Sequence, residues 1–312
     1  MSKQFRLNRK FDRIKRLEES GELKRRKQGN RALRKLLNNR LTIVGGAIFL
    51  VILLSCIFAP FLASYSPTAV DMKAILKMPS GNHLFGTDKL GRDVFARVLY
   101  GGRMSIAIGF GSALGCAVIG VLAGCYSGYR GGRFDQLMVR ISEIFMSIPQ
   151  LILVLMLVSI LGQSAKNIVI IFIICGWGSS FRMARSQVLS IREEEYVQSL
   201  KVFGLNPFVI CYKHILPNAL SPIIVNVTLS TAMFILEEAA LSFLGLGVPL
   251  EVPTWGNILN AAQDLYTLEN SWWLWLPTGI VVSLFVMSIN FLGDGIRDTT
   301  DPTQQGVVSS NL

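Results

Sequence analysis

Long runs without a charged residue constrain this chain more than any other feature. A helix needs about 20 apolar residues, at a rise of about 1.5 Å each, to cross roughly 30 Å of bilayer hydrocarbon. Of the 312 residues, 51% are hydrophobic and only 16% are charged. Six segments contain no Asp, Glu, Lys or Arg: residues 41–70, 104–129, 144–165, 167–181, 214–236 and 270–293. The sequence therefore predicts an all-α integral membrane protein with six transmembrane helices.

The fourth run, residues 167–181, is the shortest of the six. It can span only if Arg182 or Arg185, which follow it directly, extends its charged group to the membrane surface. This span is the least well defined by sequence.

The basic residues are concentrated at the N-terminus. Residues 1–40 hold 15 Lys or Arg and 4 Asp or Glu, whereas the rest of the chain has 16 of each sign. Basic segments beside a span stay in the cytoplasm, so an even number of spans places both termini there. Leucines at helical spacing in this tail suit a helix lying on anionic membrane lipid, and we expect no nucleic-acid partner.

The predicted spans give a plan for the whole chain, in a cell membrane that it crosses several times. It comprises a basic cytoplasmic tail (1–40), a first transmembrane helix (41–65), an extracellular loop (66–103), a core with five transmembrane helices (104–296) that includes a cytoplasmic loop at 190–217, and a cytoplasmic C-terminal tail (297–312).

Residue patterns for catalysis are missing from the sequence. No Gly-Lys dipeptide occurs, so the chain has no phosphate-binding loop of the G-x-x-x-x-G-K-[ST] type. His83 and His214 are the only histidines and stand far from one another, and the five cysteines form no close pair. We expect no catalytic, cofactor-binding or metal-binding residues in this chain.

Glycines are frequent in the second run. Small residues let helix backbones approach closely in lipid, where packing drives association. This run is therefore predicted to lie in the middle of the bundle, with close contacts at Gly109, Gly111, Gly115, Gly120 and Gly124.

Two carboxylates, Glu237 and Glu238, follow the fifth run. If that helix starts at Pro217, Glu237 lies about 30 Å along it, near the membrane surface. The sequence favours an interfacial position or helix contacts for these residues over a role in a transport pathway.

A polar stretch between the fourth and fifth runs contains several helix breakers. Ser190 is a candidate cap for a short helix with acidic residues in its first turn. Tyr196, Leu200 and Phe203 recur at helical spacing and predict one apolar face with no partner in the chain. Gly204 then suits a left-handed stop.

A second short helix is predicted after this stop. Asn206 and Pro207 supply its cap and its first-turn proline, and Leu216 with Pro217 ends it and starts the fifth span. Residues 190–217 are thus predicted to form two short helices joined by a tight turn, here called the elbow. A plain connection between spans is the alternative.

The elbow resembles the cytoplasmic loop of ABC importer permeases, whose pattern is E-A-A, three residues, Gly, and later Leu-Pro. The glycine matches at Gly204 and the Leu-Pro at Leu216-Pro217, but Gln198, Ser199 and Leu200 replace E-A-A, and Glu194 lies one turn earlier. Two other segments, HLFGTDKLGRDVFARVLYGGRMS (83–105) and ALSFLGLGVPLEVPTWGNIL (240–259), are similar to the second permease subunit of peptide and nickel importers.

This resemblance implies a six-helix permease of the type I importer fold. It implies three kinds of partner: a homologous second permease, two ATPase subunits that would bind the ATP, and an extracellular substrate-binding protein. The residues expected to couple the elbow to an ATPase are Glu194, Gln198, Ser199, Leu200, Gly204, Leu205, Leu216 and Pro217.

A second group of residues is implied on the outer side, as a gate or as a contact with the binding protein: Gly86, Thr87, Asp88, Gly91, Arg92 and Asp93. Turns at the two glycines and local caps at the two aspartates are the simpler interpretation.

The substrate stays open among dipeptides, oligopeptides, nickel and a metal chelate. A secondary transporter or channel is the rival class, but the sequence shows neither an internal repeat nor polar residues at mid-membrane.

Overall fold

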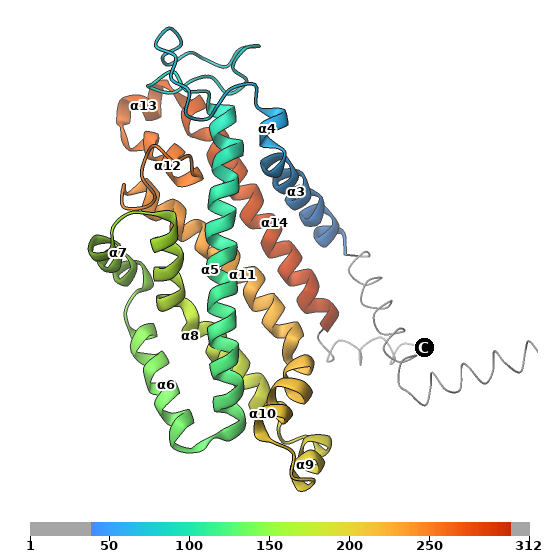
Figure 1. Cartoon of the computed structure of the whole chain (residues 1–312). Coiled ribbons are helices and arrows are strands. Elements are labelled where there is room, and N and C mark those ends of the chain that lie inside the picture. Colours follow the sequence, from blue (N-terminus) through green and yellow to red (C-terminus); the bar gives the residue numbers. More distant parts are fainter. Residues whose placement is uncertain (1–38, 301–312) are drawn as a thin grey trace, which may run out of the picture.

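The computed structural model describes residues 39–300 as a bundle of helices (Figure 1). Within this range no strand forms, and a single β-bridge joins Thr87 to Asp93. The long helices are α3 (Arg40–Ile57), α5 (Val94–Arg130), α8 (Ala165–Ile191), α11 (Leu216–Phe243) and α14 (Leu276–Thr300). The shorter ones are α4 (Ala59–Leu62), α6 (Gly132–Ser147), α7 (Gln150–Leu161), α9 (Glu195–Val202), α10 (Pro207–Val209), η1 (Ile210–Ile215), α12 (Trp255–Leu259), η2 (Asn260–Gln263), α13 (Leu265–Asn270) and η3 (Trp272–Leu274). The all-α membrane fold predicted from sequence is confirmed.

By length and composition, 5 of the described helical segments can cross a membrane. The predicted third span, 144–165, is instead divided between α6 and α7, which are bent by 86° and count as a sixth span only if taken together. Pro149 explains the break, because a proline disfavours helical geometry at the residue before it, here Ile148 with ψ 133°.

Two predicted boundaries were wrong. The predicted loop 66–103 ends at Asp93, because the aspartate side chain caps α5 at Val94 and the helix continues through charged residues. The fourth span is a helix of 27 residues rather than a short one, since Arg182 and Arg185 lie inside α8. The predicted tails fall almost wholly outside the described residues.

The long helix α5 lies in the middle of the bundle (Figure 1) and packs against α8 and α11. A Cβ built on Gly120 would lie 2.6 Å from the backbone nitrogen of Phe181, and one on Gly124 would lie 2.5 Å from its carbonyl oxygen. These glycines therefore permit direct backbone contact between α5 and α8. Gly109 and Gly115 face neighbouring side chains in the same way, whereas Gly111 meets nothing within 4 Å, contrary to the prediction for that residue.

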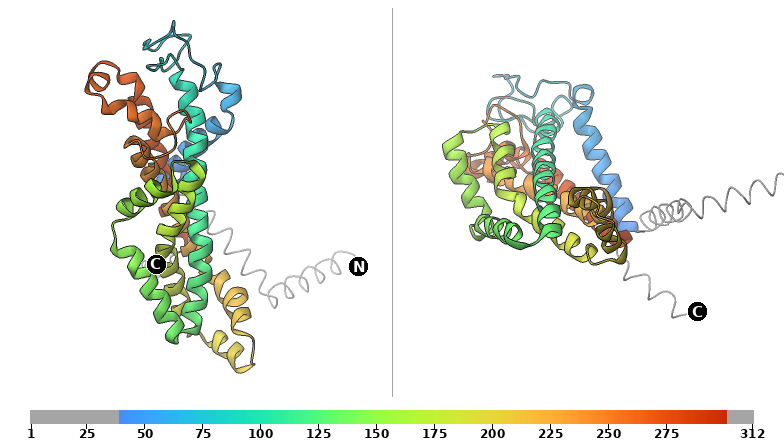
Figure 2. Two further views of the ribbon diagram at one scale, coloured as in Figure 1. Left: turned by 60° about the vertical axis from the view of Figure 1, so that its left-hand side comes forward. Right: turned by 60° about the horizontal axis from the view of Figure 1, so that its bottom comes forward.

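Loops and short helices gather at the two ends of the bundle (Figures 1 and 2). One end carries residues 63–93 together with α12 and α13, and is called the motif end. The other carries the elbow with α9 and α10. The chain thus separates its two sequence motifs by the length of α5.

The contact between α5 and α8 predicts opposite effects for two glycine substitutions. Gly120→Ala places a methyl group against backbone atoms and should cost about 1–3 kcal/mol of folding free energy. Gly111→Ala meets open space and should gain about 0.5–1 kcal/mol from helix propensity. Thermal unfolding of the detergent-purified protein should show a lower midpoint for the first variant only. Equal midpoints would contradict the close contact.

Candidate functional site

The turn of the elbow has the geometry that its sequence predicts. Gly204 has φ +72°, and its N–H donates to the Lys201 carbonyl at 3.0 Å. The Leu205 N–H donates to the Leu200 carbonyl at 3.3 Å, which completes a Schellman stop for α9. Asn206 then accepts from the Phe208 N–H at 2.9 Å and places Pro207 in the first turn of α10.

Apolar side chains hold the elbow firmly against the bundle. Val197 and Ile210 are buried, and Leu200 and Leu205 pack beside them, against residues of α5 and α8. The complete buried set is Cys125, Ala184, Val188, Val197, Ile210, Cys211 and Ile215, here called the elbow root. Tyr212 adds a hydrogen bond from its hydroxyl to the Leu122 carbonyl of α5 at 2.8 Å.

Two apolar side chains of the elbow project away from the rest of the described chain. Val202 is 86% exposed and Phe203 is 80% exposed, at the end of α9 just before the Gly204 turn. The predicted single face of Tyr196, Leu200 and Phe203 was therefore wrong: Leu200 packs against the root and Phe203 points away. The sequence missed this because Val197 is the residue that fixes the rotation of α9.

The first predicted boundary of the elbow was also wrong. Ser190 lies inside α8, which continues to Ile191, and Glu194 occupies the cap position of α9 without a capping side-chain hydrogen bond. The serine can therefore not cap α9.

Leu216 and Pro217 do not separate two helices. Residues Pro207–Phe243 form one continuous helical segment, and Ile210–Ile215 within it is a π-helix. Pro217 lacks an N–H and crowds the preceding turn, and a widened π turn accommodates this without a break. The second half of the elbow and α11 are thus parts of one helical segment.

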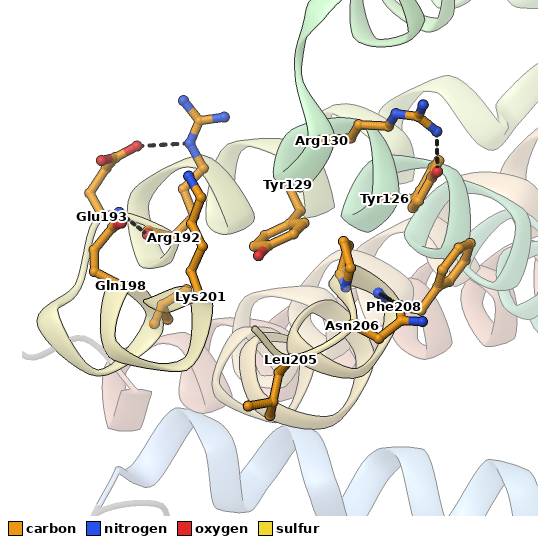
Figure 3. A pocket seen from close by; sticks show the side chains of 12 residues that line it. Tyr126, Tyr129, Arg130, Arg192, Glu193, Gln198, Lys201, Leu205, Asn206 and Phe208 are labelled. Carbon is orange, nitrogen blue, oxygen red and sulfur yellow. Dashed lines mark hydrogen bonds and ion pairs between the residues drawn. The ribbon is translucent and has the colours of Figure 1, made fainter. Parts of the chain in front are cut away.

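A groove of about 950 Å³ lies between the end of α5 and the elbow (Figure 3). The ring of Phe208 stacks on Tyr126 at 4.7 Å, and the Arg130 guanidinium lies 5.6 Å from the Tyr126 ring centre. The full lining is Tyr126, Tyr129, Arg130, Arg192, Glu193, Val197, Gln198, Lys201, Leu205, Asn206, Pro207 and Phe208. Of the residues predicted to couple the elbow, Gln198 and Leu205 face this groove.

The charges in this groove are mainly positive. Arg192 pairs with Glu193 at 2.9 Å, and its Nη1 also donates to the Gly128 carbonyl of α5 at 2.9 Å. Within residues 39–300, neither Arg130 nor Lys201 has a carboxylate partner. Gln198 donates from Nε2 to the Arg192 carbonyl at 3.0 Å, and so uses its amide within the elbow.

An ion pair that sequence reasoning missed braces the neighbouring helices. Asp135 of α6 accepts two hydrogen bonds of 2.6 Å each from the Arg185 guanidinium of α8. Ser127 of α5 donates to the same carboxylate at 2.5 Å. The one sequence signal for this pair was Arg185 itself, because a cation beside an apolar run requires a partner of opposite charge.

The GTDKLGRD residues at the motif end form a compact set of turns and caps. Gly86 and Gly91 have φ +68° and +72°, and Asp88 accepts from the Arg92 N–H at 2.9 Å and from its Nε at 2.7 Å. Asp93 caps α5 through the Ala96 N–H at 2.7 Å. These contacts confirm the simpler interpretation of the motif. A gate or a binding-protein contact stays a prediction.

Thr87 is buried at the centre of this set. Its hydroxyl accepts from the Lys77 N–H at 2.9 Å and contacts the Ala74 carbonyl, and its own carbonyl accepts from the Trp273 indole at 3.3 Å. The motif therefore joins the loop before α5 to the segment before α14.

One exposed ion pair links the motif to α13. Lys89 Nζ lies 2.7 Å from Asp264 Oδ2, and this hydrogen bond, together with one from Thr267, lowers the pKa of Asp264 to about 2. A carboxyl with a lowered pKa stabilises the fold above its ordinary pKa and loses that contribution as pH falls toward 2. The link is therefore intact at neutral pH.

The two carboxylates of the fifth span contact neighbouring helices. Glu238 is buried and accepts from the hydroxyls of Ser105 and Ser242, at 2.8 Å each. The Ser105 oxygen also accepts from the Trp255 N–H at 3.1 Å, and Glu237 accepts from Gln150 at 2.9 Å. This agrees with the predicted helix contacts, and a pathway role is not needed to explain either residue.

Candidate metal ligands are scattered in the described part of the chain. Within residues 39–300, no group of three or more His, Cys, Asp or Glu side chains could hold a metal ion. The five cysteines are buried and unpaired there.

Breaking the brace between α6 and α8 should destabilise the protein. Asp135→Ala removes the carboxylate from Arg185 and Ser127, and hydrogen bonds to charged groups contribute about 1.5–3 kcal/mol each. Glu143→Ala is the matched control, because it removes an exposed ion pair with Arg140 of the same helix, worth about 0–1 kcal/mol. Thermal unfolding in detergent should separate the two variants. Equal midpoints would show that the brace is unimportant.

Comparison with known proteins identifies the family. Residues 120–305 match the model of the binding-protein-dependent transport system inner membrane component. Residues 27–79 match the N-terminal transmembrane domain of oligopeptide transport permease C.

Proteins similar over most of the chain support this match. A dipeptide transport system permease protein of Alkalihalophilus pseudofirmus is 40% identical over 271 residues, which cover 87% of this chain and 88% of that protein. An oligopeptide transport system permease protein of Bacillus subtilis is 38% identical with the same coverage. A probable D,D-dipeptide transport system permease protein of Escherichia coli is 38% identical over 93% of this chain and 98% of its own length. The chain therefore belongs to the inner membrane permease components of binding-protein-dependent transport systems.

Proposed function

We propose that this protein is a permease subunit of an ATP-driven importer of dipeptides or oligopeptides. The elbow carries the proposal, because Val202 and Phe203 are exposed at its tip while Val197 and Ile210 fix its root to the bundle. Such an element can meet a partner at one end and transmit its movement at the other. A plain connection between spans needs neither the exposed pair nor the buried root.

The partners follow from the family. A second, homologous permease would complete the pathway, two ATPase subunits would bind and hydrolyse ATP, and an extracellular binding protein would deliver the substrate. This chain contains no phosphate-binding loop of its own, so ATP would act on it only through the ATPase subunits.

Movement of the elbow would change the access of the pathway. When ATP closes the ATPase pair, the elbow tip moves with the ATPase surface that it contacts. The elbow root and the continuous helical segment Pro207–Phe243 then carry this displacement into α5, α8 and α11 as a rigid-body movement. The protein would alternate between inward-open and outward-open states.

Peptides are the favoured substrate class. The relatives compared above are named for dipeptides, oligopeptides or D,D-dipeptides, which supports peptides over nickel or a metal chelate. Membership of a binding-protein-dependent transport family also supports an importer permease over a secondary transporter or channel.

In the proposed orientation, the elbow and both termini lie in the cytoplasm and the motif end lies outside. This rests on the basic residues of the N-terminal segment, which would remain inside. The motif end would then face the binding protein, and the turns and caps formed by Gly86, Thr87, Asp88, Gly91, Arg92 and Asp93 would support that contact or form part of an outer gate.

Substitution of Gly204 tests the role of the elbow. Gly204→Val forces a β-branched side chain into a left-handed conformation, which costs an ordinary residue about 1–2 kcal/mol, although no atom lies within 4 Å of the added Cβ. We expect loss of labelled-dipeptide uptake and of coupled ATP hydrolysis, with normal membrane insertion. Asparagine adopts the left-handed conformation more readily than other residues with a side chain, so Gly204→Asn should keep most of the uptake. Wild-type uptake in Gly204→Val would refute the assignment.

Cysteine labelling tests the orientation. Ser199 in α9 and Gly81 at the motif end are exposed, and the native cysteines are buried. In right-side-out vesicles, a membrane-impermeant maleimide should label Gly81→Cys and spare Ser199→Cys. Inverted vesicles should show the reverse, and the opposite pattern would place the elbow outside.

A further inference from the structure

We infer that the groove between α5 and the elbow receives an acidic segment of the partner ATPase. This inference rests on the proposed function, in which an ATPase meets the elbow tip. The groove and the exposed pair Val202 and Phe203 belong to the same end of the bundle, so a subunit large enough to cover the tip would also reach the groove. The ATPase would then contact this chain in two places: one part of it would bind the elbow tip, and an acidic segment would occupy the groove.

The charges that line the groove select a carboxylate. Three cations line it, Arg130, Arg192 and Lys201, and Glu193 is the only acidic residue among the lining residues. Because Glu193 is already paired with Arg192, Arg130 and Lys201 are left to attract a negative group. Complementary charges of this kind guide association and fix its register.

The apolar part of the groove is a stack of aromatic rings. Phe208 and Tyr126 stack with an interplanar angle of 20°, and Phe208 is 52% exposed. The Arg130 guanidinium lies against the Tyr126 ring and donates to its hydroxyl at 2.5 Å (Figure 3). A segment that fits both parts carries an Asp or Glu next to an apolar side chain.

The departure from E-A-A has a consequence for this groove. Gln198 stands where the permease pattern has glutamate, and it lines the groove together with Lys201. A glutamate at this position would add a negative charge beside the cations and weaken their attraction for a carboxylate. The neutral Gln198 therefore makes the groove more basic, and we expect the matching ATPase surface to be more acidic.

Photo-crosslinking in the complete complex tests the occupant. A photoactivatable phenylalanine analogue would replace Phe208 in the groove and, in a separate preparation, Phe203 at the tip. Mass spectrometry of the products should find ATPase peptides from both positions, with an Asp or Glu in the peptide joined at 208. Products at 208 that contain lipid, the second permease or an ATPase peptide without an acid would overturn the inference.

The two positions separate this inference from the proposed function. If the analogue at 203 joins the ATPase and the one at 208 does not, the elbow contacts the ATPase but the groove does not receive it. If neither position joins the ATPase, the proposed function itself fails.

Charge reversal provides a second test that does not depend on crosslinking. Lys201→Glu alters an exposed side chain, and we expect about a tenfold weaker binding of the ATPase at low salt, with the difference shrinking in high salt. Arg140→Glu is the matched control, since Arg140 is an exposed arginine of α6 outside the groove. Equal binding by wild type and Lys201→Glu at low salt would overturn the inference.

Discussion

Direct backbone contact between α5 and α8 is the constraint on which the other parts depend. Apolar side chains gain little by leaving lipid for a protein interior, so helices in a membrane associate through close packing. Gly120 and Gly124 bring the backbone of α8 against α5, and Cys125 of α5 with Ala184 and Val188 of α8 continues that contact into the elbow root. A bulkier residue at either glycine would therefore separate the helices that hold the elbow in place.

Local sequence signals predicted the elements of the elbow that depend on backbone chemistry. The left-handed Gly204, the Asn206 cap and the first-turn Pro207 were all found where the sequence places them, because each depends on its immediate neighbours. The rotation of α9 was not predictable in the same way. Val197 decides it by packing against distant residues of α5 and α8, and helical spacing alone cannot distinguish that face from the one with Phe203.

The same distinction applies to the spans and to the ionic contacts. Uncharged runs located most of the membrane helices, but they underestimated α8, where Arg185 finds a carboxylate 50 residues away in Asp135. They also joined α6 and α7, although Pro149 breaks the segment between them. Charges interrupt a run in sequence without ending the helix, whereas a proline can end it within an uncharged run.

Helical continuity gives the two ends of the bundle a mechanical connection. From Pro207 to Phe243 the chain has no non-helical break, so a rotation of the elbow must also turn or bend α11. At the far end of that helix, buried Glu238 holds the Ser105 hydroxyl of α5, and Ser105 holds the Trp255 N–H of α12. A carboxylate so deeply buried is costly to separate from its partners, so these contacts would move as one unit. Displacement at the elbow would therefore reach the motif end through α11 and Glu238, and no flexible loop would need to carry it.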